Sequence, residues 1–185
     1  SYTYTHYGNT MTGPKNTFWN ATEKVAYIYD GGSITGAWGS SDPLSGITSS
    51  ADLSIVGGSG SEGLNFFVNR TTEFSGNLTA SMGDGGDSIT SGLFKDGDSI
   101  DMGAGGDSVS FVNHNTTYQG APALSALSMT KLDGGAGIDS LSFTYNEAAI
   151  ELNLSFGGAT NFENITGSGA AEVIRGDTGA NVLSG

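Results

Sequence analysis

Apolar and polar residues alternate over short stretches of this chain, and glycine or small polar residues bound most of the stretches. The alternation is clear at 2–6, 25–29, 64–68, 141–143 and 150–154. A period of two residues is that of a β-strand with one buried face, and the flanking Gly, Asn, Asp and Ser residues favour turns. Helical periodicity is nearly absent. The pattern therefore predicts an all-β protein built from many short strands.

A nine-residue motif recurs from the middle of the chain onward. Residues 82–90 have the sequence Met-Gly-Asp-Gly-Gly-Asp-Ser-Ile-Thr, and residues 102–110 repeat it almost letter for letter. Residues 134–142 fit the pattern G-G-x-G-x-D-x-U-x without a mismatch, where U is a large apolar residue, and residues 93–101 keep the same frame in weaker form. Glycine-rich nonapeptides of this kind are typical of proteins in which short parallel strands stack.

The nonapeptides resemble the calcium-binding repeats of the RTX, or hemolysin-type, family of secreted bacterial proteins. The resemblance covers about 82–142 and 167–185. It implies an all-β fold, a right-handed parallel β-roll or β-solenoid. In such a fold the glycines form the turns, and the apolar U residue of each short strand points inward.

The resemblance also implies how the chain is divided. Residues 57–185 are expected to form the β-roll, with spacer segments at about 111–133 and 143–166. Residues 1–56 show no such resemblance. There we expect an irregular β segment that caps the first coil or meets another molecule through its aromatic side chains.

Two nonapeptides form one coil of such a roll, so aspartates two nonapeptides apart stack on the same edge. Asp87 and Asp107 are two nonapeptides apart once the two inserted residues, Ser91-Gly92, are left out of the count. Asp98 lies between them in the sequence and is expected on the opposite edge. The resemblance assigns the metal ligands to aspartate carboxylates and glycine carbonyls, namely Gly83, Gly85, Asp87, Asp98, Gly103, Gly105, Asp107, Gly135, Gly137 and Asp139.

Oxygen ligands of this kind suit Ca²⁺, which takes about six to eight of them, and the lack of nearby imidazole or thiolate argues against Zn²⁺ and Cu²⁺. Crowded aspartates repel one another without a cation, so we expect folding of 82–142 to be coupled to calcium binding. Three frames carry another residue in the sixth place, and we interpret them as turns without metal: Glu62, Glu172 and Asn181.

Composition narrows the possible functions. The chain has 6 Lys+Arg against 19 Asp+Glu, a formal net charge of −13, which disfavours nucleic acids and anionic membranes as partners. It has no cysteine, hence no disulfide or thiolate metal site, and no apolar run long enough to cross a membrane. The 31 glycines fit a thin core that is built coil by coil.

No catalytic motif is present, and we expect a protein that is not an enzyme. The two histidines, His6 and His114, do not form H-E-x-x-H, and both G-x-S-x-G and G-K-[ST] are missing. The function that fits best is a calcium-dependent bacterial structural protein, secreted or at the cell surface, such as a surface-layer, filament or adhesin subunit. Two alternatives remain open: a non-catalytic C-terminal secretion and folding module of a larger secreted enzyme, and a glycan-binding module.

Self-association is the main partnership that the pattern predicts. Residues 181–185 form an open nonapeptide with no cap after it, and the N-terminal segment carries aromatic residues that favour interfaces, Tyr2, Tyr4, Tyr7 and Trp19. We expect copies to assemble when calcium orders the coils. A cell-surface glycan, stacked on the same aromatic rings, is the second candidate partner. No nucleic-acid partner and no membrane insertion are expected.

Overall fold

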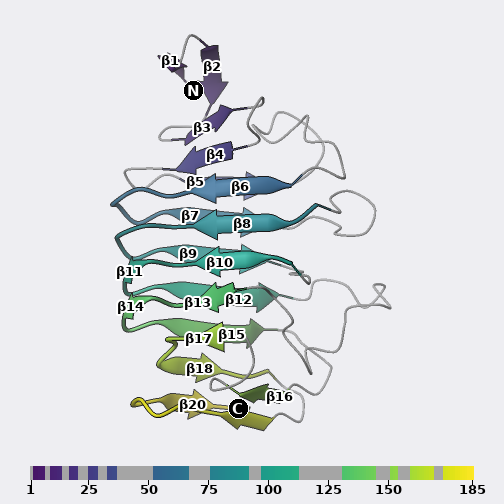
Figure 1. Ribbon diagram of the computed structural model, residues 1–185, viewed down its shortest axis with the longest axis vertical. Coiled ribbons are helices and arrows are strands. Elements are labelled where there is room, and N and C mark those ends of the chain that lie inside the picture. Colours follow the sequence, from purple (N-terminus) through teal and green to yellow (C-terminus); the bar gives the residue numbers. More distant parts are fainter. Residues whose placement is uncertain are drawn as a thin grey trace.

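A computed structural model describes the backbone of about three fifths of the chain. The described residues are 2–6, 9–13, 17–20, 25–28, 33–36, 52–66, 76–91, 97–112, 131–144, 151–153, 159–168 and 173–185. Every element within these ranges is a β-strand, and most strands pair in parallel (Figure 1). The all-β class predicted from the alternation is therefore confirmed.

Two seven-stranded sheets contain most of the strands. Sheet 1 contains, in spatial order, β17 (Ala159–Thr160), β13 (Lys131–Asp133), β10 (Ser99–Asp101), β8 (Leu78–Ser81), β6 (Leu53–Val56), β4 (Val25–Ile28) and β3 (Thr17–Asn20). Sheet 2 contains β20 (Val182–Ser184), β18 (Asn164–Thr166), β15 (Ser140–Thr144), β12 (Ser108–Val112), β9 (Ser88–Ser91), β7 (Gly63–Phe66) and β5 (Ser33–Gly36). From β4 to β10 the chain alternates between the two sheets, one strand in each in turn.

Three smaller sheets have two strands each. They pair β1 (Tyr2–His6) with β2 (Asn9–Gly13), β11 (Ala104–Gly105) with β14 (Ala136–Gly137), and β16 (Glu151–Asn153) with β19 (Val173–Arg175). Antiparallel pairing is confined to the N-terminal part of the described chain, where β1 pairs with β2 and β3 with β4. The side chains of the aromatic residues expected there as a cap or interface, Tyr2, Tyr4, Tyr7 and Trp19, lie outside the described part.

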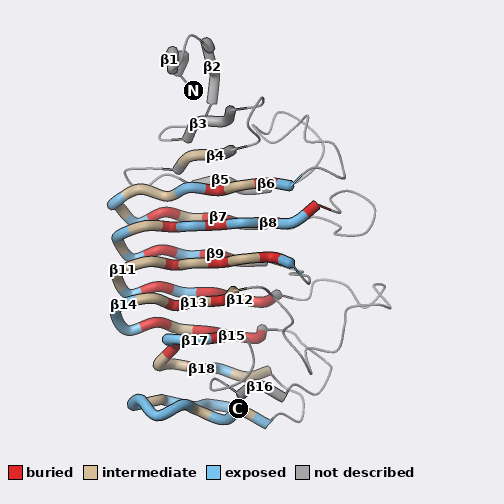
Figure 2. Tube along the Cα trace, in the orientation of Figure 1, coloured by how far each residue is buried: buried red, intermediate tan, exposed pale blue. Residues whose placement is uncertain are grey.

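The core lies between the two sheets and runs, in the described part, from β6 and β7 to β17 and β18 (Figure 2). Strand β8 shows why these sequences form strands, because Leu78 and Ala80 are buried while Thr79 and Ser81 are exposed. The fully buried apolar residues of the paired strands are Leu53, Ile55, Leu78, Ala80, Ile100, Leu132 and Ala159 in sheet 1, and Leu64, Ile89, Val109, Leu141, Phe143 and Ile165 in sheet 2. In the frames between residues 82 and 142 the residue in the U position therefore points inward, as the sequence pattern predicts.

The segments expected as spacers also contribute strands. Strand β13 falls within 111–133, and β17 and β18 fall within 143–166. All three extend the two large sheets in parallel register. Their frames are harder to recognise in the sequence because the glycines are missing, although the buried apolar residue is kept.

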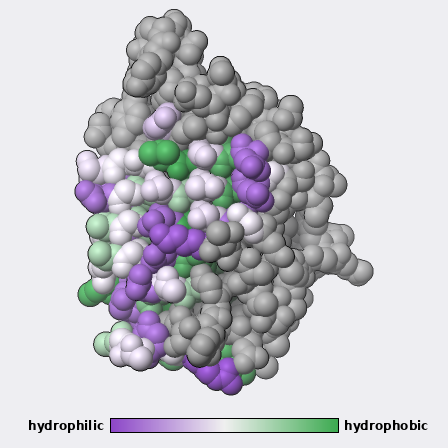
Figure 3. Space-filling model, in the orientation of Figure 1, coloured by the Kyte–Doolittle hydropathy of each residue, from purple (hydrophilic) through white to green (hydrophobic). Residues whose placement is uncertain are grey.

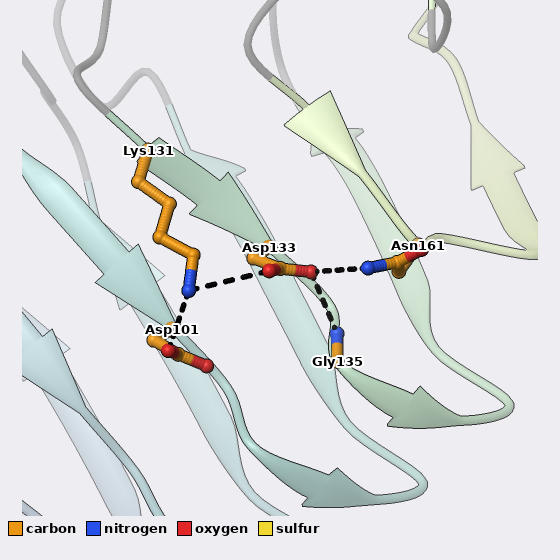
Figure 4. A network of polar contacts seen from close by, with 5 residues as sticks. All are labelled: Asp101, Lys131, Asp133, Gly135 and Asn161. Atoms are coloured by element: carbon orange, nitrogen blue, oxygen red, sulfur yellow. Dashed lines mark hydrogen bonds and ion pairs between the residues drawn. The ribbon is translucent and has the colours of Figure 1, made fainter.

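The outer face of sheet 1 carries a charged network that joins three neighbouring strands (Figure 4). Lys131 Nζ lies 2.5 Å from Asp101 Oδ2 and 3.3 Å from Asp133 Oδ2. Asp133 Oδ1 also accepts hydrogen bonds from Asn161 Nδ2 at 2.7 Å and from Gly135 N at 3.1 Å. These contacts raise the pKa of Lys131, chiefly through Asp101. Burial would raise the pKa of Asp133, but the Asn161 and Lys131 hydrogen bonds outweigh it and lower that pKa.

Hydrophilic residues form a band across the described part of the face shown in Figure 3. Exposed apolar side chains occur singly at Val56 and Ile138, and three more lie on the last strands at the C-terminal end. Val173 on β19 is 45% exposed, and Val182 and Leu183 on β20 are 66% and 44% exposed. Leu183 pairs in register with Ile165, which is buried, so the inward face of the stack is uncovered at β20.

Candidate metal-binding column

Carboxylate residues precede the strands of sheet 2 and stand one above another. Asp87, Asp107 and Asp139 come directly before β9, β12 and β15, and the register pairs Ser88 with Ser108 and Ser108 with Ser140. Two residues outside the consensus frames take the same place, Glu62 before β7 and Glu163 before β18. We call these five residues, Glu62, Asp87, Asp107, Asp139 and Glu163, the acidic column.

A continuous series of hydrogen bonds joins the acidic column. The backbone N–H of Glu62 donates to Oδ1 of Asp87 at 2.7 Å, and that of Asp87 donates to Oδ1 of Asp107 at 2.7 Å. The N–H of Asp107 donates to Oδ1 of Asp139 at 2.7 Å, and that of Asp139 donates to Oε2 of Glu163 at 2.8 Å. Each carboxylate thus satisfies a backbone donor of the preceding turn, which would otherwise be buried without a partner.

The second oxygen of each aspartate in the column is buried and unsatisfied. Asp87 and Asp107 are 1% exposed and Asp139 is 0% exposed. The Oδ2 atoms of all three have no hydrogen-bond partner. A buried carboxylate oxygen without a partner carries a large desolvation cost, so native proteins usually pair it or place it against a metal ion.

The environment of the column disfavours the charged form of its aspartates. Burial raises the pKa of Asp87 to about 6, and the negative charges of Glu62 and Asp107 act in the same direction, while the hydrogen bond from the Glu62 N–H opposes them. Burial likewise raises the pKa of Asp107 and of Asp139. At neutral pH the column therefore concentrates negative charge in a place where ionised carboxylates are poorly solvated.

Asp98 does not belong to the acidic column. It precedes β10 in sheet 1, on the other side of the stack, which is where the half-coil spacing predicted it. Its side chain is fully buried, and its Oδ1 accepts a hydrogen bond from the Leu78 N–H at 2.8 Å. Nearby, Asp52 Oδ1 accepts a bond from the Asn77 N–H at 2.8 Å.

The six glycines predicted as carbonyl ligands lie in turns that stack closely. All six have positive φ, and a Cβ added to Gly103 would lie 1.8 Å from the carbonyl oxygen of Gly83. The Gly83 and Gly103 carbonyls accept backbone hydrogen bonds from Ala104 and Ala136, each at 2.8 Å. A carbonyl oxygen has two lone pairs, so each of these two retains one for a further donor or a cation.

Glu62, whose turn the sequence analysis interprets as metal-free, and Glu163, which lies in an expected spacer segment, both stand in the acidic column; whether the Glu62 turn binds metal stays a prediction. The signal that identifies them is an acidic residue two positions before a buried apolar one. Glu62 precedes Leu64 and Glu163 precedes Ile165 in this way, as Asp87 precedes Ile89. The spacing of acidic and apolar residues is thus a better guide to the column than the glycines are.

Within the described ranges, no group of three or more His, Cys, Asp or Glu side chains converges on a single point. A metal ion at the acidic column would therefore be held by a pair of neighbouring carboxylates together with backbone oxygens.

The described residues also contain no helix able to span a membrane. Comparison of the chain with protein-family models, with curated proteins and with solved structures found no match. The resemblance to RTX repeats accordingly rests on the nonapeptides themselves.

Proposed function

We propose that this chain is a right-handed parallel β-roll that binds Ca²⁺ along its acidic column, and that it serves as a bacterial extracellular structural protein. In this proposal the protein folds and assembles at the cell surface when calcium is present. The observation that carries the proposal is the set of buried, unsatisfied Oδ2 atoms of Asp87, Asp107 and Asp139. The alternation of parallel strands between two sheets supports the β-roll.

The donor set of the column fits Ca²⁺. The column offers only oxygen, and Ca²⁺ prefers carboxylate and carbonyl oxygens in flexible arrangements. The aspartates of the column would hold the ions, with carbonyls of the stacked glycines as further ligands, and Asp98 would serve a site on the opposite side. A bound ion neutralises the buried carboxylates that face it. The hydrogen bonds within the column keep each Oδ1 in place and leave Oδ2 available.

Dependence of folding on calcium follows from the same charges. The aspartates of the column are removed from water, and their raised pKa values reflect that burial. Ionised groups in such surroundings destabilise the folded state at neutral pH unless a cation compensates them. Calcium is far more abundant outside cells than inside. A chain with this column would stay unfolded during export and fold after it.

Assembly is supported by the C-terminal end of the stack. Strand β20 is an edge strand of sheet 2, and its apolar Val182 and Leu183 are exposed. Edge strands with exposed apolar side chains favour pairing with another chain. The net charge of −13 opposes association. Bound calcium would reduce that charge, so ordering and association are expected together.

The experiment is a calcium titration of the whole chain in EGTA-treated buffer, followed by circular dichroism and light scattering in the same sample, with Mg²⁺ as the control ion. The expected result is a rise in β signal with Ca²⁺ but not with Mg²⁺, followed by an increase in scattering. Identical spectra in excess EGTA and in millimolar Ca²⁺ would refute calcium-dependent folding. Folding without any increase in scattering would refute assembly and favour the secretion and folding module.

A further inference from the structure

Glu163 occupies the last position of the acidic column, in a turn without the glycines of the repeat. Its Oε2 accepts the N–H of Asp139 at 2.8 Å, the same bond that each aspartate of the column makes with its preceding neighbour. Strand β18, which follows it, pairs with β15 in unbroken parallel register. The longer glutamate side chain thus reaches the place that an aspartate carboxylate takes in the other turns.

We propose that Glu163 is itself a metal ligand, and that together with Asp139 it holds a Ca²⁺ ion at the C-terminal end of the acidic column. This inference rests on the proposed function of the column. Asp139 supplies the unsatisfied buried oxygen, because its Oδ1 accepts the Asp107 N–H while its Oδ2 has no partner. Glu163 supplies the second carboxylate, on a side chain that is only partly buried and so is open to an ion from solvent.

The 2.8 Å hydrogen bond from Asp139 N to Glu163 Oε2 brings the Glu163 carboxylate next to Asp139, so the two side chains are neighbours in the column. Burial is the largest cause of the raised pKa of Asp139, and the negative charges of Asp107, Glu163 and Asp133 add to it. Glu163 therefore acts on Asp139 as Asp107 does on the other side. A cation between Asp139 and Glu163 would relieve this repulsion, in the same way as one between two aspartates.

The column ends at Glu163 because the next turn has an amide in its place. Asn181 Oδ1 accepts the N–H of Asp177 at 3.0 Å, and its Nδ2 donates to the Phe162 carbonyl at 3.4 Å. The N–H of Glu163 donates to the Asp139 carbonyl at 3.1 Å and does not continue the series to Asn181. The Asn181 amide is neutral and already hydrogen-bonded, so it supplies no negative charge that would attract a further ion.

The other glutamate of the column is arranged differently. Glu62 Oε2 accepts the N–H of Gly58, in its own turn, at 3.3 Å. Glu163 instead directs its carboxylate to the N–H of the preceding turn, across the space between neighbouring strands. The two ends of the column are therefore not equivalent, and the inference concerns Glu163 alone.

The test counts bound calcium ions by native mass spectrometry of the whole chain in saturating Ca²⁺. Glu163→Gln keeps an oxygen that can accept the Asp139 N–H but removes the charge. The expected result is one ion fewer than in wild type, whereas Glu163→Asp and the neighbouring Asn181→Ala keep the wild-type number. An unchanged ion count and calcium midpoint in Glu163→Gln would overturn the role of Glu163. No bound calcium in wild type would instead overturn the proposed function of the whole column.

A measurement on the wild type makes the test independent of how the variant folds. A crystal structure of the calcium-loaded wild type measures the distance from each carboxylate oxygen to the ion. The proposal expects an oxygen of Glu163 within about 2.6 Å of an ion that an oxygen of Asp139 also contacts. An ion on Asp139 with both Glu163 oxygens well beyond that distance would show that Glu163 only accepts a hydrogen bond, and would overturn the inference.

Discussion

Replacing Asp87 by asparagine should stabilise the protein without calcium and weaken its response to calcium. The asparagine Oδ1 can still accept the Glu62 N–H, so the hydrogen bond at 2.7 Å is kept. What changes is the charge on a side chain that is 1% exposed. The opposite signs expected in the two conditions distinguish a metal ligand from a residue that merely packs in a turn.

The magnitude follows from the pKa of Asp87, which folding raises from 3.8 to about 6. That difference corresponds to roughly 3 kcal/mol by which the ionised form destabilises the folded state at pH 7.5. Asparagine removes this penalty but introduces a buried amide donor whose incomplete pairing costs about 1–2 kcal/mol. The expected net gain in the free energy of unfolding, without calcium, is about 1–2 kcal/mol.

The assay is circular dichroism in EGTA with increasing trimethylamine oxide, an osmolyte that favours compact states. Asp87→Asn should reach half of its folded signal at a lower osmolyte concentration than wild type. In calcium it should bind at least one ion fewer and need more calcium to fold. Asp84→Asn, an exposed residue of the same turn, is the matched control and should change neither. A variant that is less stable than wild type in EGTA, or that keeps the full ion count, would refute the reasoning.

Without calcium, stability should fall as the pH rises from 4.5 to 7.5. Folding raises the pKa of Asp87 from 3.8 to about 6. The protonated Asp87 side chain therefore contributes fully to stability below about pH 4, and this contribution is lost as the pH rises through 6. The trimethylamine oxide midpoint for folding in EGTA, followed by circular dichroism at each pH, checks this, and a midpoint that falls as the pH rises would contradict it. Gly103→Ala should destabilise the calcium-loaded protein by at least about 2 kcal/mol, since φ is 93° and the new Cβ meets the Gly83 oxygen; urea unfolding measures it. Leu183→Glu, on the exposed β20, should abolish self-association with the calcium count unchanged, and sedimentation velocity that still shows oligomers would count against β20 as the contact.

The stacking of Asp87 on Asp107 could be predicted from the sequence, because the two turns are almost identical and only two residues are inserted between them. The inward direction of Ile89 and Val109 followed from the period-two alternation, and both are fully buried. The placement of Asp98 on the opposite side followed from the nonapeptide period. These predictions succeeded where the repeat is nearly regular and local spacing determines the register.

The rest of the column could not be predicted from the same pattern. Asp139 stacks on Asp107 although residues 113–130, outside the described part, intervene, and no local period specifies that pairing. Glu163 was hidden by the loss of the turn glycines and by the extra methylene of its side chain. In each aspartate of the column one carboxylate oxygen accepts a backbone N–H and the other has no partner. Three-dimensional contacts determine which oxygen does which, and the consensus frame contains no information about these contacts.

In the described part of the chain, the turns that precede the strands of sheet 2 favour the folded state least. The strands themselves favour it, because their side chains are buried and their backbones are paired. In the strands, side chains such as Val109 are fully buried and parallel partners continue on both sides. The turn from Gly103 to Asp107 combines glycines, which lose more conformational freedom on folding than any other residue, with a carboxylate removed from water. Both costs fall on the same few residues and recur at the turn of Asp139. A cation at the acidic column would therefore act where it changes the balance between folded and unfolded states most. Because each carboxylate holds the N–H of the preceding turn, ordering one turn favours the order of its neighbour.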